Sequence, residues 1–250
     1  MKRFRVLYYL VFIFLLTLSA CKKGDQGPAG PAGPSLTGDL IGYCTLYDVN
    51  GNKVTDSRGI LVTVEGANRS AITDSAGRFD VTGISTGIYN ISFAKGGYGT
   101  RKTISYSFVG GGSAYFGTTS IYQIPFFSII NLASDTSGTT VTITGSLIGS
   151  LPTGIRVIRL FGGTSSNVTY NPKDYLFTLS SASPGPATTF TYNISSSTFN
   201  FYGVNSGQTI YLVAYSESIS SGSYLDIATG KTIYPNINTT PSNVITVVVP

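Results

Sequence analysis

From Gly38 onward, short apolar or alternating segments repeat along the chain and are divided by turn signals. Tyr89, Ile91 and Phe93 alternate with Asn90, Ser92 and Ala94, a period of two that is typical of a strand with one buried face. Glycine, asparagine, aspartate and serine separate the segments, as they do at β-turns. The pattern predicts strands over 40–48, 60–65, 70–73, 79–84, 89–94, 104–108 and 114–125.

The same pattern continues through the second half of the chain. Val141, Ile143 and Gly145 alternate with threonines, which predicts a strand over 139–147. Further strands are expected over 155–161, 175–179, 190–194, 199–204, 210–215 and 244–249. We therefore expect an all-β protein with two consecutive β-sandwich domains, over 38–125 and 126–250.

The first twenty residues have a different pattern. Basic residues precede an apolar run from Val6 to Leu18, which is shorter than the roughly 20 residues of a membrane-spanning helix. Small residues follow the run. A basic start, a short apolar segment and small residues before a cut are typical of a secretory signal peptide, so 1–20 are predicted to be removed.

Leu18, Ser19, Ala20 and Cys21 resemble the bacterial lipobox. The resemblance implies that Cys21 is diacylated on sulfur and becomes the mature N-terminus. Two acyl chains anchor a protein stably without a spanning helix. Lys22 follows the cysteine, in place of the aspartate that often retains lipoproteins in the inner membrane. We expect a lipid-anchored protein of the cell envelope, at the outer membrane, that faces either the periplasm or the exterior.

Residues 21–37 form a predicted linker. Four Gly-X-Y triplets run from Gly24 to Ser35 and resemble a short collagen tract. Four triplets are few for an independent triple helix, so we expect an extended spacer. At about 3.1 Å per residue, thirteen residues would reach up to roughly 40 Å. Trimerisation through the tract is the alternative, and the oligomeric state is left open.

A tight turn is predicted where Thr73 and Asp74 precede Gly77 and Phe79. We expect Asp74 to cap the turn, Gly77 to take a positive φ and Phe79 to enter the core. Motifs in the same order over 42–48, 50–51, 59–64, 87–89 and 97–98 complete a resemblance to the carboxypeptidase regulatory-like domain, a transthyretin-like β-sandwich of exported bacterial proteins. The resemblance covers 38–125 and implies a non-catalytic scaffold or interaction role.

The second predicted sandwich carries a weaker resemblance. Residues 204–214 are similar to the penultimate strand of fibronectin type III and related domains, although one residue longer. The resemblance implies an immunoglobulin-like architecture for 126–250.

Composition removes several classes of function. The chain has no histidine, which excludes Ser-His-Asp triads, Cys-His dyads and histidine-ligated metals. Glu65, Asp174, Glu217 and Asp226 are candidate carboxylates for a glycosidase, but nothing in their spacing marks an acid and a nucleophile. We therefore predict no catalytic residue, no metal and no cofactor, and a hydrolase is the less favoured alternative.

A calcium loop is suggested by Asp48, Asn50 and Asn52, which place oxygen ligands at alternating positions. The glycine falls at the fourth place and no glutamate follows at the twelfth, unlike a calcium-binding EF-hand loop. An Asn-Gly hairpin turn accounts for the same residues. We expect the turn, and the sequence leaves calcium binding by either sandwich open.

Charge gives no support for nucleic-acid binding, and the cysteine content gives no support for an intramolecular disulfide. Removal of 1–20 takes three of the 16 basic residues, which leaves 13 against 11 acidic residues and gives nucleic-acid binding no electrostatic support. With Cys21 acylated, Cys44 has no intramolecular disulfide partner. Cys44 lies in an apolar strand, where a small buried side chain is expected.

Tyrosine offers the clearest candidate surface. Tyr98, Tyr106, Tyr115 and Tyr122 form a candidate ligand face, since the ring combines an apolar face with a polar tip, and core packing is the alternative. We expect a non-catalytic binding or adhesion role at the envelope, toward a glycan, peptide or protein. The alternative is a structural accessory subunit that docks onto an outer-membrane complex.

Overall fold

The computed structural model describes residue 33 and residues 35–250, and Ser35–Pro250 form one compact unit. The predicted signal peptide, the lipobox residues Leu18, Ser19 and Ala20, the lipidation site Cys21 and most of the Gly-X-Y triplets lie outside the described residues. Within the described part, no helix has both the length and the apolar character needed to cross a bilayer.

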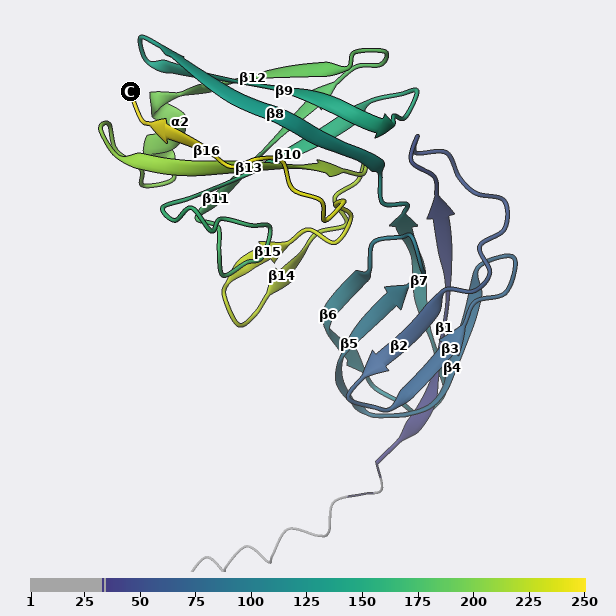
Figure 1. Cartoon of the computed structure of the whole chain (residues 1–250). Coiled ribbons are helices and arrows are strands. Elements are labelled where there is room, and N and C mark those ends of the chain that lie inside the picture. Colours follow the sequence, from purple (N-terminus) through teal and green to yellow (C-terminus); the bar gives the residue numbers. More distant parts are fainter. Residues whose placement is uncertain (1–32, 34) are drawn as a thin grey trace, which may run out of the picture. The chain divides into compact units, whose positions relative to one another are not determined.

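The expected all-β fold is confirmed. In the N-terminal half two sheets face each other across a shared apolar core (Figure 1). One sheet has the order β4-β1-β7, with β1 (Thr37–Tyr47) between β4 (Arg78–Ser85) and β7 (Ser113–Tyr122). The other has the order β3-β2-β5-β6, formed by β2 (Leu61–Glu65), β3 (Arg69–Ile72), β5 (Gly87–Ala94) and β6 (Arg101–Phe108). β1 pairs antiparallel with β4 and parallel with β7.

The C-terminal half is a second pair of facing sheets. The order β11-β10-β13-β16 joins β10 (Arg156–Gly163), β11 (Phe177–Ser183), β13 (Thr209–Glu217) and β16 (Ile245–Val248). The order β12-β9-β8 joins β8 (Phe126–Ser137), β9 (Thr140–Ser150) and β12 (Thr189–Ser195). A small hairpin of β14 (Tyr224–Asp226) and β15 (Lys231–Ile233) lies outside both sheets (Figure 1). The predicted boundary at 125/126 stays a prediction.

Alternation along the strands builds the cores. On β1, Leu40, Cys44 and Leu46 are buried between the sheets, whereas Tyr43 faces outward. β13 departs from this rule because nearly all of its residues are buried. Ile210, Leu212 and Ala214 enter the main core, and Val213 and Tyr215 enter a second cluster on the opposite face of the sheet. Side chains therefore cover both faces of β13, and the outer face of its sheet carries a packed cluster of its own.

The expected turn after Thr73 is confirmed in its geometry. The Asp74 carboxylate accepts a hydrogen bond from the Arg78 backbone amide at 2.9 Å, and Gly77 has φ +82°. Phe79 is 1% exposed and packs edge-on against Phe93, with ring centres 5.6 Å apart. The sequence therefore encodes this hairpin locally.

The prediction of a strand over 199–204 is wrong. Ser196–Phe201 form a short helix, α2, and the Ser195 hydroxyl caps it by accepting from the Thr198 amide. Phe199 is fully buried in the C-terminal core. A serine cap and one buried aromatic residue are compatible with a single helical turn. The apolar pattern alone therefore did not distinguish a strand from a short helix.

Candidate functional site

The four tyrosines of the predicted ligand face do not share one surface. Tyr106 packs against the N-terminal core, with its ring centre 5.2 Å from that of Phe116, and Tyr98 packs against the same core. Tyr115 faces outward on β7 and is 67% exposed. Tyr122 also faces outward and stacks on Tyr47, with ring centres 4.8 Å apart. Nothing in these contacts tests ligand binding.

The carboxylates singled out in the sequence are also separate. Glu65 pairs with Lys102 at 2.7 Å, and Asp226 accepts from the Thr229 hydroxyl at 2.5 Å. Asp48 accepts from the Asn50 and Asn52 amides at 2.9 and 2.8 Å, which is the geometry of a turn. Among the residues that the structure describes, no three acidic or cysteine side chains gather as metal ligands would.

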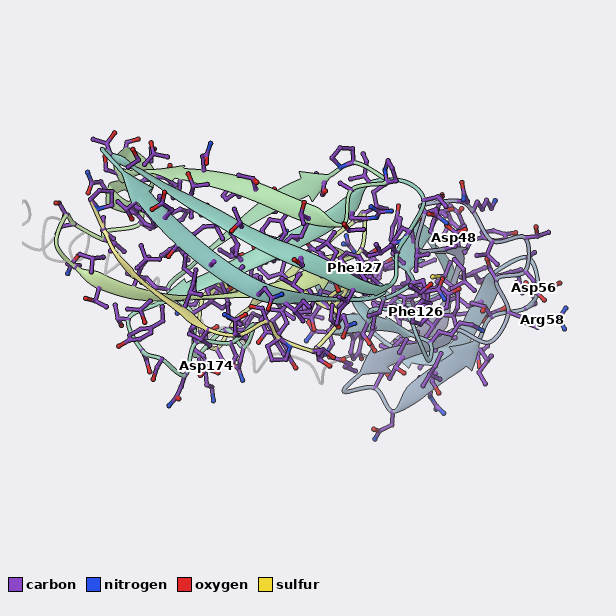
Figure 2. The ribbon with its side chains drawn as sticks, turned by 45° about the horizontal axis from the view of Figure 1, so that its top comes forward. Asp48, Asp56, Arg58, Phe126, Phe127 and Asp174 are labelled. Atoms are coloured by element: carbon purple, nitrogen blue, oxygen red, sulfur yellow. The ribbon has the colours of Figure 1, made fainter. Side chains whose placement is uncertain are left out.

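Other acidic residues sit in exposed loops. Figure 2 shows Asp56 beside Arg58 on the loop between β1 and β2, where the two form an exposed ion pair of 2.5 Å. It also shows Asp174 on the loop that joins β10 to β11. Of these side chains, only Asp174 borders a pocket in the C-terminal half.

An aromatic cluster covers the outer face of the sheet β11-β10-β13-β16. Phe161 is fully buried at its centre. The rings of Tyr175, Tyr215 and Tyr234 surround it, with centres 5.1, 5.6 and 5.8 Å away. Tilted and edge-to-face pairs of this kind add to the free energy gained from burial. The cluster fixes the β10–β11 loop and the β14–β15 hairpin against the sheet.

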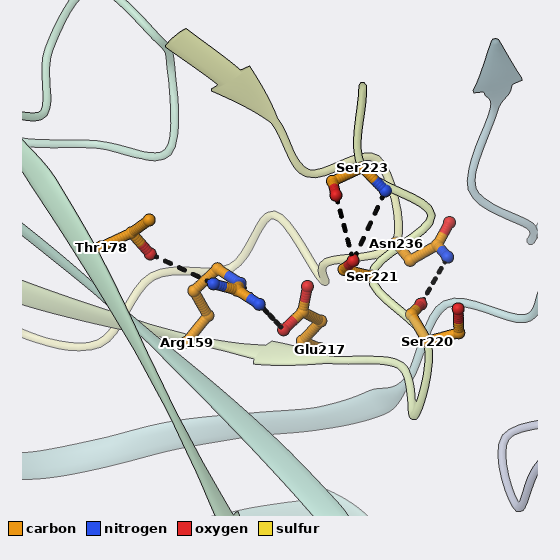
Figure 3. Close-up of polar contacts among 7 residues, drawn as sticks. All are labelled: Arg159, Thr178, Glu217, Ser220, Ser221, Ser223 and Asn236. Carbon is orange, nitrogen blue, oxygen red and sulfur yellow. Dashed lines mark hydrogen bonds and ion pairs between the residues drawn. The ribbon is translucent and has the colours of Figure 1, made fainter. Parts of the chain in front are cut away.

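A buried ion pair lies beside this cluster. Arg159 on β10 reaches Glu217 on β13, with its Nε and one terminal nitrogen each 2.8 Å from the same carboxylate oxygen, Oε2 (Figure 3). The guanidinium also lies 3.9 Å from the centre of the Tyr234 ring. Burial raises the pKa of the Glu217 carboxyl, and Arg159 opposes the rise without cancelling it. The other oxygen, Oε1, is buried and has no hydrogen-bond partner among the described residues.

A polar pocket of about 440 Å³ opens above the aromatic cluster. Three segments supply its lining: the end of β10, the β10–β11 loop and β15. The lining residues are Gly163, Thr164, Ser165, Asn167, Lys173, Asp174, Tyr175, Leu176 and Lys231. Residues that carry hydroxyl, amide, carboxylate and ammonium groups thus line one space, beside the largely buried Tyr175.

Hydrogen bonds fix the pocket walls. The Asp174 carboxylate accepts from the Thr169 hydroxyl at 2.6 Å, which closes the loop on itself. The Tyr175 hydroxyl donates to the Thr232 carbonyl oxygen at 2.5 Å, and the Lys231 ammonium donates to the Tyr175 carbonyl oxygen. The loop and the hairpin therefore hold each other, and the pocket is preformed.

Sequence reasoning missed most of this pocket. It named Asp174 as a candidate carboxylate, but it gave no role to Lys173 or Lys231, which lie on different elements. The available signal was length: residues 164–176 separate two adjacent antiparallel strands, whereas hairpin loops usually have two to five residues. A loop of that length is commonly a binding loop.

Comparison with known proteins assigns no family to the chain. No protein-family model matches it, and no curated protein matches it. A cohesin–X-dockerin complex from Acetivibrio cellulolyticus matches at 24% identity and a TM-score of 0.29, over 34% of this chain and 57% of that chain. This chain thus spans little more than half the length of that neighbour.

Two further solved structures match over most of this chain. A DUF3823 family protein from Parabacteroides merdae is 11% identical, with a TM-score of 0.31, and a Bacteroides uniformis protein with a proposed carbohydrate-binding role is 17% identical, with a TM-score of 0.30. Each match covers 86% of this chain and 100% of that chain. TM-scores this low carry no functional argument.

Proposed function

We propose that this protein is a membrane-anchored envelope lipoprotein that binds a glycan, without turnover, in the polar pocket of its C-terminal sheets. The observation that carries the proposal is the convergence of Asn167, Asp174 and Lys173 on a preformed space beside Tyr175. Amide, carboxylate and ammonium groups pair with sugar hydroxyls.

The pocket supports binding rather than hydrolysis. Asp174 is the single carboxylate among its lining residues. Hydrolysis of a glycosidic bond normally uses two carboxyl groups, one as acid and one as nucleophile or base. Glu217 is 2% exposed and held by Arg159, so it does not line the pocket.

Membrane anchoring in this proposal rests on the sequence. The lipobox-like residues and Cys21 support acylation, and the linker to residue 37 limits how far the folded part can lie from the bilayer. The lipid would place the protein at the membrane, and the pocket would bind the glycan.

A glycan array probed with the fragment 35–250 tests the binding. This fragment is one compact unit with its own apolar cores, so it can be studied without the lipid. We expect glycan ligands whose binding falls at least about tenfold in Asp174→Asn, which corresponds to the loss of about one charged hydrogen bond. Asp135→Asn, an exposed carboxylate on β8, is the matched control and should bind as the wild type does.

Two results would contradict the proposal. Equal binding by the wild type and Asp174→Asn would place the ligand elsewhere, and an absence of binding to every glycan would favour the docking alternative. Acylation is tested separately by mass spectrometry of the protein extracted from membranes. Cys21→Ser should abolish both the acyl groups and the partition into detergent.

Docking onto a membrane complex remains the second candidate, and one observation favours it. Tyr43 and Tyr115 are exposed on the outer face of the sheet β4-β1-β7, the face that also carries the Tyr47–Tyr122 stack. Exposed tyrosines on the face of a sheet suit a protein partner. Crosslinking from Tyr115 in intact cells, with a photoreactive residue in its place, would reveal such a partner.

A further inference from the structure

Three exposed apolar side chains lie at one end of the N-terminal sheets. Leu36 precedes β1, Ile88 follows the β4–β5 turn, and Val109 follows β6. These side chains are 55%, 72% and 70% exposed, respectively. Strand pairing places all three at the end of these sheets where β1 and β7 begin, the end at which β5 starts and β6 finishes. We call Leu36, Ile88 and Val109 the apolar tip.

Hydrogen bonds hold the tip in place. The Thr86 hydroxyl lies within bonding distance of two carbonyl oxygens, 3.1 Å from that of Leu36 and 2.5 Å from that of Val109. The Thr86 amide also donates to the Leu36 carbonyl oxygen at 2.8 Å. One residue thus joins the three segments that carry the tip, and the apolar side chains are not on a loose loop.

The surroundings of the tip are small and mostly uncharged. Ser85, Ser107 and the run Gly110–Gly112 flank it. Two charged side chains of opposite sign contact Gly83 on β4: Asp39 accepts from its amide at 3.0 Å, and Arg69 donates to its carbonyl oxygen at 3.3 Å. The chemistry of this end therefore suits an apolar, neutral environment.

We propose that the apolar tip inserts into the interface of the membrane to which the chain is anchored. The argument from position is that the described fold begins at Ser35, so the predicted anchor is joined to this end. Fifteen residue steps separate Cys21 from Leu36, a maximum reach of about 50 Å. The tip is therefore held near the bilayer at a high effective concentration.

This inference rests on the proposed lipid anchor and adds a second contact to it. The acyl chains place the protein at the membrane, and the length of the linker limits how far the fold can lie from it. Insertion of the tip would set the resting orientation, with the opposite end of the same sheets turned away from the lipid. Because the tip lacks an excess of positive charge, the contact should depend little on anionic lipid or salt.

Tryptophan fluorescence tests the insertion cleanly because the natural chain contains no tryptophan. The full acylated protein, as Ile88→Trp, would be reconstituted into phosphatidylcholine vesicles containing brominated lipid. Ile72→Trp is the matched control, since Ile72 is 68% exposed in the same sandwich. Pairing of Ile72 with Leu61, and of Leu61 with Ala94, places it about 20 Å from Ile88 along the strand direction.

We expect the Ile88→Trp emission to shift to shorter wavelength and to be quenched at least twofold by brominated lipid. The emission of Ile72→Trp should remain that of an exposed tryptophan. Val109→Trp is a second probe that should behave like Ile88→Trp, and far-ultraviolet circular dichroism checks that each variant is folded. Equal emission from positions 88 and 72 in a protein shown to be acylated would overturn the proposal while leaving the anchor intact.

Failure of the anchor would look different. If mass spectrometry finds no acyl group and the chain does not float with vesicles, the lipoprotein assignment fails. The tip is then tested with fragment 35–250 attached through an N-terminal histidine tag to nickel-chelating lipid. Quenching at position 88 but not 72 in that arrangement would support insertion, and no quenching at either position would reject it.

Discussion

Arg159 directs two of its nitrogens at a single oxygen of Glu217, Oε2, at 2.8 Å each, and leaves Oε1 buried without a partner among the described residues. The side chains of Arg159 and Glu217 are 11% and 1% exposed. Only one of the two carboxylate oxygens of Glu217 therefore has a hydrogen-bond partner in the described part of the chain. A buried oxygen without a partner lowers the free energy of unfolding when the carboxyl is ionised. The pair therefore gives the C-terminal sheets a dependence on pH.

Removal of the cation should be severe at neutral pH. Arg159→Met leaves the Glu217 charge buried and uncompensated, so we expect a loss of about 3–5 kcal/mol in the free energy of unfolding. Urea unfolding at pH 7 would measure it. Lys102→Met, which breaks the partly exposed pair with Glu65, is the control and should cost less than about 1 kcal/mol. Similar losses in both variants would show that the Arg159 pair is not distinctive.

The pH dependence follows from the raised pKa of Glu217. A carboxyl whose pKa is higher in the folded protein than in the unfolded chain favours folding below its ordinary value of 4.5, and this contribution is lost as pH rises through the folded-state pKa. We expect Glu217→Gln to remove that part of the slope. Urea unfolding of both proteins between about pH 4 and 8 would show it, and parallel curves would contradict it.

The buried thiol should be inert in the folded protein. Burial raises the pKa of Cys44 to about 12, and the side chain is fully buried. The thiolate is the reactive form, so a thiol reagent at pH 8 should not label the fragment 35–250 until guanidinium unfolds it. One thiol should then react. Rapid labelling without denaturant would show that the N-terminal core opens readily.

The turn glycine should resist substitution for two separable reasons. Gly77 has φ +82°, and an added Cβ would lie 2.1 Å from the Cys44 carbonyl oxygen. Gly66 has φ +88° but open space around it. Gly66→Ala should therefore cost only the backbone strain, about 1 kcal/mol, and Gly77→Ala should cost clearly more. Thermal unfolding of both variants would compare them, and equal costs would remove the steric contribution.

The aromatic cluster should control the pocket. Phe161→Ala removes the ring around which Tyr175, Tyr215 and Tyr234 pack, and we expect a loss of about 3–5 kcal/mol together with faster trypsin cleavage after the exposed Lys173. Phe199→Ala is the control, since Phe199 is equally buried but lies in the main C-terminal core. At matched global stability, selective cleavage after Lys173 in Phe161→Ala alone would confirm the local role. Equal cleavage in both would deny it.

Much of the N-terminal half was readable from local sequence. The alternation over 89–94 and the turn ending at Phe79 specify strand, face and turn type without reference to distant residues. Such features depend on the period of the strand and on the backbone conformation of one glycine. Their agreement with the structure reflects that local origin.

The helix α2 and the pocket could not be read in the same way. Phe199 looks like any apolar residue in a strand-rich chain, and only the space between the C-terminal sheets selects the helical turn that buries it. Lys231 reaches the β10–β11 loop from a hairpin that is 56 residues away from Tyr175 in sequence. No local pattern encodes a contact at that separation.

The sequence alone determined the strand-forming character of the chain, the absence of histidine chemistry and the prediction of a lipid anchor at Cys21, since each depends on residue type and short-range order. Tertiary structure decided which tyrosines are exposed, where a polar pocket forms, and that Leu36, Ile88 and Val109 meet at one end. The physical reason is that strand pairing joins residues that are far apart in sequence, and burial is decided only after the sheets have packed.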